Sequence, residues 1–286
     1  MASSLPKDSS SPPRNTTTTG TGLHVGRLFG VDVSLDATLL VVFFLVATSL
    51  GRGTLPRWHP DWSPALVWAV SIGAAVAFLS SVLLHELSHA VVAKAQGTKV
   101  RGITLFMLGG IAQIDEEPAT PGREFWMAIV GPFTSVAVGI GASAAGAWAL
   151  HAEHPGLVQS APVQALRSAG AATTLLLWLG PVNLSLGVFN LVPGFPLDGG
   201  RVLRSILWAL SKNRVTATLW AGAVGSAFGW LLIAVGVLMT FGGSVRFFGS
   251  GAVQGLWLVL LGWFLASAAR ASRERTLGGR GSASSA

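Results

Sequence analysis

The chain of 286 residues is 51% hydrophobic and only 11% charged. This composition excludes an ordinary soluble domain and predicts an all-α polytopic membrane protein. The absence of Cys excludes disulfides, Cys-ligated zinc and thiol catalysis, and it leaves His and carboxylate side chains as the strong metal ligands. The formal net charge of +7 could indicate nucleic-acid binding, but its meaning depends on where the basic residues lie relative to the apolar segments.

Six segments are apolar over a length that crosses, or nearly crosses, a bilayer. We expect one membrane-embedded domain over residues 23–270, because no connection between the segments is long enough for a separate folded module. Residues 1–22, which lack the apolar core of a signal peptide, and the basic residues 271–286 are predicted to be disordered cytoplasmic tails. The segments cover about residues 34–50, 65–95, 124–150, 171–192, 216–241 and 251–269.

The second apolar segment contains the pattern His-Glu-x-x-His at residues 85–89. His85 and His89, four residues apart, lie on one face of a helix and can bind one metal, while Glu86 can act on the water that the metal activates. The alternative is a structural role, in which the His side chains bond helix carbonyls and Glu86 pairs with one of them. Ionisable groups are costly inside a bilayer, so the pattern favours a functional metal site.

A β-hairpin is predicted between the second and third segments, because Val100 to Ile114 carries Ile, Thr, Leu, Phe and Met around Gly109-Gly110. This connection is apolar for a cytoplasmic loop, and its strand edge could pair with an extended peptide. A hairpin that merely caps the bundle is the alternative. In the third segment, Gly131-Pro132 predicts either a kink or close helix packing.

A catalytic zinc ion usually takes three protein ligands, so a third ligand is needed. After the fourth segment, Pro193 and Pro196 end the helix before a new helix begins near Gly199. Asp198 is the remaining carboxylate candidate in the membrane region, although by itself it could equally be an N-cap. Surface or interfacial roles are expected for the other histidines, His24, His59, His151 and His154.

In the fifth segment, Gly225 and Gly229, with Gly222 nearby, predict a close helix-packing face. The sixth segment leads into the basic tail. Along the chain, tails and connections rich in Lys and Arg alternate strictly with connections that are poor in them. This pattern favours a multi-pass protein of the cell membrane with both termini in the cytoplasm. Topology thereby explains the basic bias without nucleic acid. Arg52, Arg57, Arg167 and Arg246 fall on the outer side, and all other Lys and Arg residues fall on the cytoplasmic side.

Two motifs together resemble the site-2 proteases, intramembrane zinc metalloproteases that cut transmembrane helices of other proteins. The motifs are His-Glu-Leu-Ser-His at 85–89 and Asn-x-x-Pro-x-x-Pro-Leu-Asp-Gly-Gly at 190–200. The resemblance covers most of the chain between Gly26 and Ala269, and the layout is similar to the compact prokaryotic branch with six spans. It implies that one zinc ion is bound by His85, His89 and Asp198, that Glu86 is the general base, and that Asn190 assists near the oxyanion or holds substrate.

The resemblance also implies the reaction: peptide-bond hydrolysis by zinc-activated water within or near transmembrane segments of single-pass proteins, in regulated intramembrane proteolysis. Anti-sigma factors or other single-pass regulators are the implied substrates, and the lipid bilayer is the other partner. Some relatives carry PDZ or CBS modules. The chain has room for neither, so we expect substrate selection without them.

Two alternatives compete with this interpretation. The first is a membrane zinc protease of the type that cuts prenylated or unfolded proteins and takes its third ligand from a later Glu. After Asp198 the only acidic residue is Glu274 in the tail, which argues against it. The second is a non-proteolytic membrane metal transporter or scaffold that uses the His pair for ion passage. Metal content, proteolysis and vesicle transport would separate the two classes.

Overall fold

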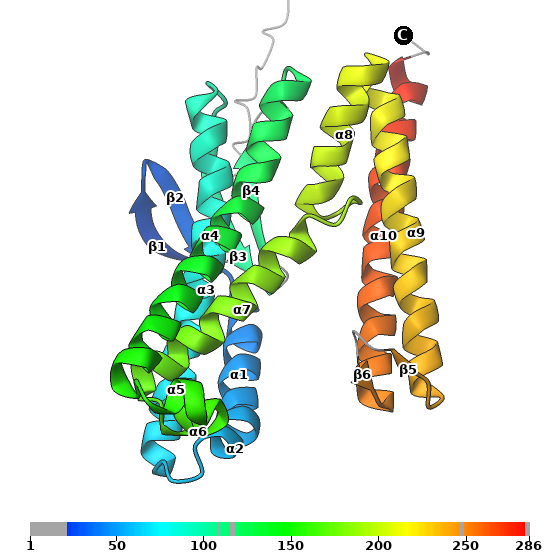
Figure 1. Ribbon diagram of the computed structural model, residues 1–286. Coiled ribbons are helices and arrows are strands. Elements are labelled where there is room, and N and C mark those ends of the chain that lie inside the picture. Colours follow the sequence, from blue (N-terminus) through cyan, green and yellow to red (C-terminus); the bar gives the residue numbers. More distant parts are fainter. Residues whose placement is uncertain (1–21, 108, 115–117, 246–248, 284–286) are drawn as a thin grey trace, which may run out of the picture.

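The chain folds into a bundle of long helices with a small sheet on one flank (Figure 1). The computed structural model describes residues 22–107, 109–114, 118–245 and 249–283. Within these residues six helices are long and apolar enough to cross a membrane, which confirms the predicted fold class. The predicted tail at residues 1–22 falls almost entirely outside them. The six spans are Leu39–Trp58, Pro64–Ala95, Pro121–Glu153, Ala171–Asn190, Arg214–Thr240 and Ala252–Leu277.

Local sequence starts three of the long helices. The N-caps Ser63, Thr120 and Asn213 each accept a hydrogen bond from the backbone N–H three residues on, at 3.3, 3.3 and 3.1 Å. Proline follows Ser63 and Thr120 at a position where it needs no helical donor. The helices are α1 (Leu39–Ser49), η1 (Leu50–Thr54), α2 (Leu55–Trp58), α3 (Pro64–Ala95), α4 (Pro121–Glu153), α5 (Leu157–Ser160), α6 (Pro162–Ser168), α7 (Ala171–Asn190), α8 (Asp198–Ser211), α9 (Arg214–Thr240) and α10 (Ala252–Ala283).

The sheet is larger than the predicted hairpin. Strands β3 (Val100–Phe106) and β4 (Gly109–Ile114) pair antiparallel, which confirms the hairpin. Two N-terminal strands that the sequence analysis did not predict, β1 (Leu23–Leu28) and β2 (Val31–Leu35), complete the order β1-β2-β3-β4. The pairing of β2 with β3 is parallel and joins residues far apart in the chain, so no local sequence pattern predicts it. A two-stranded pair, β5 (Ser244–Val245) and β6 (Gly249–Ser250), precedes α10.

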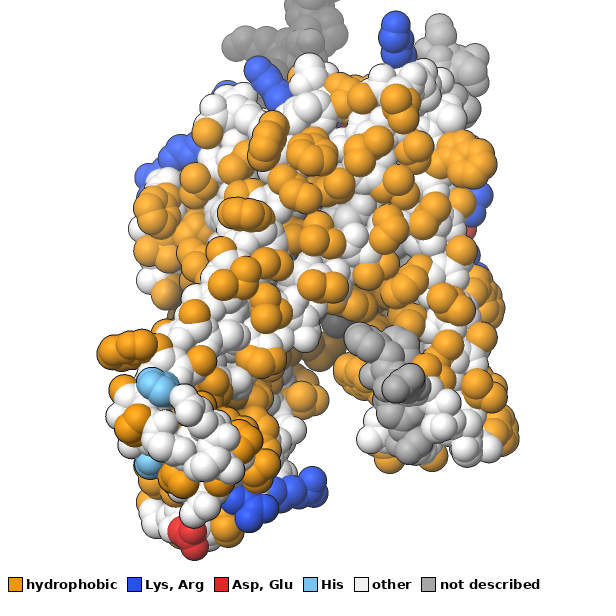
Figure 2. Space-filling view, in the orientation of Figure 1, with side chains coloured by type: hydrophobic (Ala, Val, Ile, Leu, Met, Phe, Trp, Pro, Cys, Tyr) orange, Lys and Arg blue, Asp and Glu red, His pale blue; other side chains and the backbone are white. Residues whose placement is uncertain are grey.

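Helix α8 links two groups of helices: α3, α4 and α7 pack together, and α9 packs along α10 (Figure 1). Apolar side chains cover most of the visible outer face in Figure 2, and Lys and Arg gather toward its two ends. Large side chains such as Phe133, Trp148 and Trp230 are more than half exposed on the spans. A surface of this kind suits hydrocarbon, which agrees with the multi-pass membrane assignment.

Glycine lets α9 lie against its neighbours. A Cβ added at Gly229 would lie 2.7 Å from Gly262 O of α10, and one added at Gly225 would lie 2.7 Å from Phe195 N in the loop before α8. The close packing face predicted from these two glycines is thus present, and it serves α10 and that loop together.

Helix α10 continues beyond the boundary predicted at residue 270. The Arg273 side chain covers Gly222 of α9, where an added Cβ would lie 2.5 Å from Arg273 Cγ. The Thr276 hydroxyl donates to Ser272 O at 2.9 Å. Residues 271–277 are polar and basic in composition, yet they are helical. Their packing against α9 is a tertiary contact, which composition cannot predict.

We predict that Gly229→Leu destabilises the protein by about 1–3 kcal/mol, because overpacking forces α9 and α10 apart. The matched control is Gly141→Leu on α4, where an added Cβ meets nothing within 4 Å. Thermal unfolding in detergent, followed by circular dichroism, measures both. Equal midpoints for the two variants would contradict the packing argument.

Candidate metal centre

Helix α3 brings His85 and His89 together one turn apart, as the spacing requires. The two residues are buried, with 4% and 6% of their surface exposed. Their Nε2 atoms face each other at 3.2 Å. A pair of desolvated imidazole nitrogens this close needs a shared proton or a cation between them, because two lone pairs repel.

Asp198 joins the histidine pair from the first turn of α8. Its Oδ2 lies 3.1 Å from His85 Nε2 and 3.2 Å from His89 Nε2. The N-cap of α8 is Leu197, and no side-chain cap bond is present there. The alternative role of Asp198 as an N-cap therefore does not describe this helix. Its carboxylate instead faces the two imidazoles across the bundle.

The geometry of these three groups fits a zinc ion. Their ligand atoms all lie within 4.8 Å of one another. Bonds of about 2.0–2.1 Å in a tetrahedral site place ligand atoms roughly 3.3 Å apart. The observed separations of 3.1, 3.2 and 3.2 Å between the two Nε2 atoms and Oδ2 come close to that spacing. Two imidazoles and one carboxylate also match the donor preference of a catalytic zinc site, which keeps one position open.

Helix α4 orients both imidazole rings. His89 Nδ1–H donates to Met127 O at 2.6 Å, since a carbonyl oxygen only accepts. This bond leaves the Nε2 lone pair of His89 turned toward Asp198. His85 Nδ1 bonds Ser135 Oγ at 2.9 Å. Partners of this kind fix the ring orientation of metal-binding histidines. The sequence analysis identified neither Met127 nor Ser135, because nothing in their local pattern marks them.

Gly131 lies in α4. From the sequence, this residue could cause a kink or allow close helix packing. An added Cβ there would overlap His89 Nε2 and lie 2.7 Å from His85 Nε2. Only glycine lets α4 approach the imidazole edges this closely. The close-packing alternative is therefore the one that the structure shows, and the partners of Gly131 are the two histidines.

The glycines after Asp198 let the loop between α7 and α8 fold back on itself. A Cβ at Gly199 would overlap the backbone of Leu191, and one at Gly200 would overlap Gly194. These contacts direct the start of α8, and with it Asp198, toward α3. The backbone thus approaches itself closely at Gly199 and Gly200.

Glu86 lies beside the His pair and contacts the hairpin. Its Oε1 accepts a hydrogen bond from the Gly110 N–H at 3.0 Å. A Cβ added at Gly110 would lie 2.6 Å from Glu86 Cγ, so the second glycine of the hairpin gives the carboxylate its room. Strand β4 is an edge of the sheet, and its first residues therefore lie next to the candidate base.

Asn190 is not among the residues that the structure brings together at the metal centre. It ends α7, and its Nδ2 donates to Leu186 O of the same helix at 3.0 Å. Any contact with a reacting group would require this amide to turn away from its helix.

The remaining histidines lie outside the centre. His24 and His151 are exposed, and His154 bonds Ser168 O at 2.9 Å. His59 is only 2% exposed, so it has no surface role, although it directly follows the end of the first span. Stacking on Trp62, with ring centroids 3.9 Å apart, buries it.

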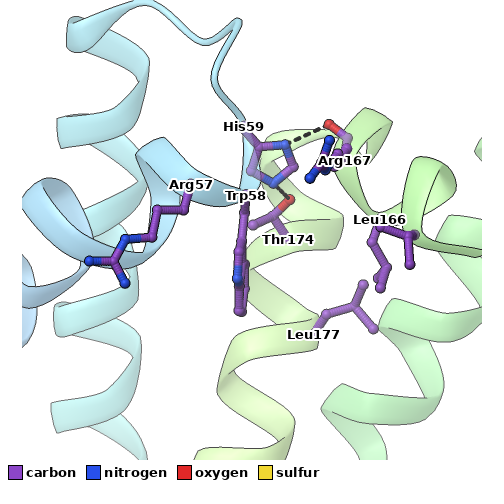
Figure 3. Close-up of a pocket in the computed structure, with 8 residues that line it drawn as sticks. Arg57, Trp58, His59, Leu166, Arg167, Thr174 and Leu177 are labelled. Carbon is purple, nitrogen blue, oxygen red and sulfur yellow. Dashed lines mark hydrogen bonds between the residues drawn. The ribbon is translucent and has the colours of Figure 1, made fainter.

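Figure 3 shows His59 between Arg167 and Thr174, to both of which it is hydrogen-bonded, and we interpret its role at the end of the first span as structural. Its Nδ1–H donates to Arg167 O at 2.8 Å, and its Nε2 accepts from the Thr174 hydroxyl at 2.9 Å. Burial lowers the pKa of His59 and keeps the ring neutral for this arrangement. The cavity beside it measures about 440 Å³ and is lined by Arg57, Trp58, His59, Val163, Leu166, Arg167, Thr174 and Leu177.

Comparison with known proteins agrees with this centre. The sequence model of peptidase family M50 matches residues 73–233, a range that contains the His pair and Asp198. A protein of Synechocystis sp. named as a zinc metalloprotease is 37% identical over 243 residues, which are 85% of this chain and 57% of the relative. A protein of Mycobacterium tuberculosis with the same description is 35% identical over 253 residues, 88% of this chain and 59% of the relative. The chain therefore spans less than two thirds of the length of these relatives.

A solved structure shares the fold. The site-2 protease from Methanocaldococcus jannaschii superposes with a TM-score of 0.53 at 25% sequence identity. The match covers 88% of this chain and 95% of the solved chain. The two proteins thus share the fold over most of their lengths.

We predict that Gly131→Ala removes bound metal, because the added methyl group displaces both imidazole edges. Zinc content of the purified protein, measured by mass spectrometry of the metal, should fall from one ion per chain to well below that. Gly141→Ala on the same helix, at an open position, should keep its zinc. Retention of full zinc by Gly131→Ala would show that α4 does not limit the site.

Proposed function

The chain belongs to peptidase family M50, the site-2 proteases, and on that premise we propose that this multi-pass membrane zinc metalloprotease hydrolyses peptide bonds within or near transmembrane segments of single-pass proteins. The observation that carries the proposal is the cluster of His85, His89 and Asp198, with Glu86 beside it on α3. A buried site in a bundle of apolar spans is reached most directly by a substrate that is itself in the membrane.

In this proposal His85, His89 and Asp198 hold one zinc ion through two Nε2 atoms and one carboxylate oxygen. Zinc supplies Lewis-acid activation of a water molecule and of the peptide carbonyl. The α4 groups Met127 O and Ser135 Oγ keep the imidazoles oriented for binding.

Glu86 is the proposed general base and acid. Its carboxylate takes the proton from the attacking water and returns it to the leaving amine. The Gly110 N–H holds one carboxylate oxygen at 3.0 Å, so the other oxygen remains for the water. Asn190 is proposed to donate to the developing oxyanion or to hold substrate, after its amide leaves Leu186 O.

A substrate helix must unwind before its carbonyls become accessible. The edge strand β4 supports an extended conformation for the substrate, because its backbone groups can pair with an added strand and its first residues adjoin Glu86. Single-pass regulators such as anti-sigma factors are the proposed substrate class, and regulated intramembrane proteolysis is the proposed setting.

We further propose that both termini lie in the cytoplasm. Lys94 lies at the end of the second span, and Lys212 and Arg214 lie at the start of the fifth, so chain order puts these three residues on one side of the bundle. Arg52, near the end of the first span, and Arg167, before the fourth, lie on the other side. The basic side is the cytoplasmic one by the positive-inside rule. On this orientation the sheet and α8 belong to the cytoplasmic half.

We predict that Glu86→Gln keeps zinc but loses cleavage of a single-pass substrate by about 10²–10⁴-fold, the usual contribution of general acid–base catalysis. The matched control is Glu274→Gln on α10, far along the chain from the centre, which should cleave normally. A metal transporter using the His pair would be indifferent to Glu86→Gln, and full activity of that variant would sink the protease mechanism.

The orientation can be tested by cysteine labelling, because the chain contains no Cys. Single cysteines at the exposed positions Asp61 and Gln159 should react with a membrane-impermeant maleimide on intact cells. Cysteines at Lys212 and Glu274, also exposed, should react only after lysis. The opposite pattern would place the termini outside.

A further inference from the structure

A buried ion pair joins α4 to α8 close to the metal centre. Glu124 lies in the first turn of α4 and is fully buried. Its Oε1 accepts two hydrogen bonds from the Arg204 guanidinium, one of them from Nε at 2.6 Å and the other from a terminal nitrogen. The Arg204 side chain is itself only 11% exposed. Two donors of one guanidinium on one carboxylate oxygen restrict how α8 can slide or turn against α4.

Arg204 also contacts the loop that delivers Asp198. Its guanidinium carbon lies 5.2 Å from the centre of the Phe195 ring. Phe195 is buried and stands three residues before Asp198. Asp198 and Arg204 lie within two turns of the same helix. The position of Arg204 is therefore transmitted to Asp198 through both the helix and the loop.

Helix α4 is at the same time the element that orients the histidines. Met127, one turn after Glu124, accepts from His89, and Ser135 bonds His85. Gly131 lies against both rings. The His pair and α8 thus both contact the same helix, α4. The separation between the imidazoles and the Asp198 carboxylate depends on where α8 docks on α4.

We propose that Glu124 and Arg204 are positioning residues, whose ion pair sets the place of Asp198 relative to His85 and His89 and thereby the zinc affinity. The inference rests on the proposed ligand set, since it acts through Asp198. Neither side chain touches the three ligand atoms in any described contact. Both act at a distance, through α8 and the loop before it.

The energetics of the pair support a positional role over a purely stabilising one. A buried ion pair is often no more stable than apolar residues of the same size, because both charges lose water. Glu124 Oε2 is buried and has no hydrogen-bond partner among the described residues, so this pair is also incompletely satisfied. An apolar contact would hold α8 nearby but would tolerate sliding, whereas two N–H donors directed at the one oxygen Oε1 fix one register.

The test measures the zinc dissociation constant of the purified full chain by competition with a chelator, at a temperature where each variant is folded. Glu124→Gln should raise that constant about tenfold, the lower end of the range for groups that hydrogen-bond a metal ligand directly, because Glu124 acts through α8. In an Asp198→Asn background the same substitution should add less than twofold, because the ligand through which it acts is already lost. Equal factors in both backgrounds, or an unchanged constant for Glu124→Gln, overturn the inference.

Two further variants keep the test decisive. Leu232→Ala, in the buried contact between α9 and α10, should lower the unfolding midpoint and leave the zinc constant within twofold. A comparable loss of zinc affinity in Leu232→Ala would mean that any destabilisation weakens the site, which refutes positioning. If Glu124→Gln does not fold, Arg204→Lys replaces it, keeping the charge without the fork. It should weaken zinc binding several-fold, and an unchanged constant overturns the inference.

The same data separate this inference from the proposed function. Asp198→Asn alone should weaken zinc binding strongly. If it does not, the ligand assignment fails, and the positioning role fails with it. If Asp198→Asn weakens binding but Glu124→Gln acts independently of it, the ligand assignment stands and only the positioning role is refuted.

Discussion

The structure depends on the close approach of three electron-rich atoms, His85 Nε2, His89 Nε2 and Asp198 Oδ2, inside an apolar bundle. Separations of 3.1–3.2 Å between desolvated lone pairs are unfavourable unless a positive charge lies among them. Zinc, which the family binds, is the charge that suits two imidazoles and a carboxylate. Much of the surrounding structure serves to hold these atoms together despite their repulsion.

Helix α4 does most of this holding, although it contributes none of the three ligand atoms. Its Met127 carbonyl and Ser135 hydroxyl orient the rings, and Gly131 allows the approach. Its first turn anchors α8 through Glu124. Because all of these contacts come from one helix, they fix the imidazoles and α8 in a common frame. The glycines before and within α8 complete the arrangement by letting the connecting loop fold tightly.

The sheet adds a second function to the same region. Among the described residues strand β4 pairs only with β3, and its Gly110 N–H donates to Glu86. If this edge lies within the bilayer, protein or water must satisfy its backbone groups. An extended substrate would satisfy them and would present its carbonyls beside the metal and the proposed base. The start of β4 at Gly109-Gly110 would then contribute both to substrate binding and to the placement of the proposed base.

The sequence by itself determined the six spans, the β3–β4 hairpin, the His pair and the candidate Asp198, because apolar length, helical spacing and proline breaks are local properties. Only the tertiary structure decided the rest. The parallel pairing of β2 with β3, the burial of His59, the helical stretch beyond residue 270 and the roles of Gly131, Ser135 and Glu124 arise from contacts between distant segments. A contact between distant segments produces no periodic pattern in the sequence of either segment. From the sequence we could therefore predict the ligands of the metal centre, but not the residues of α4 that support them.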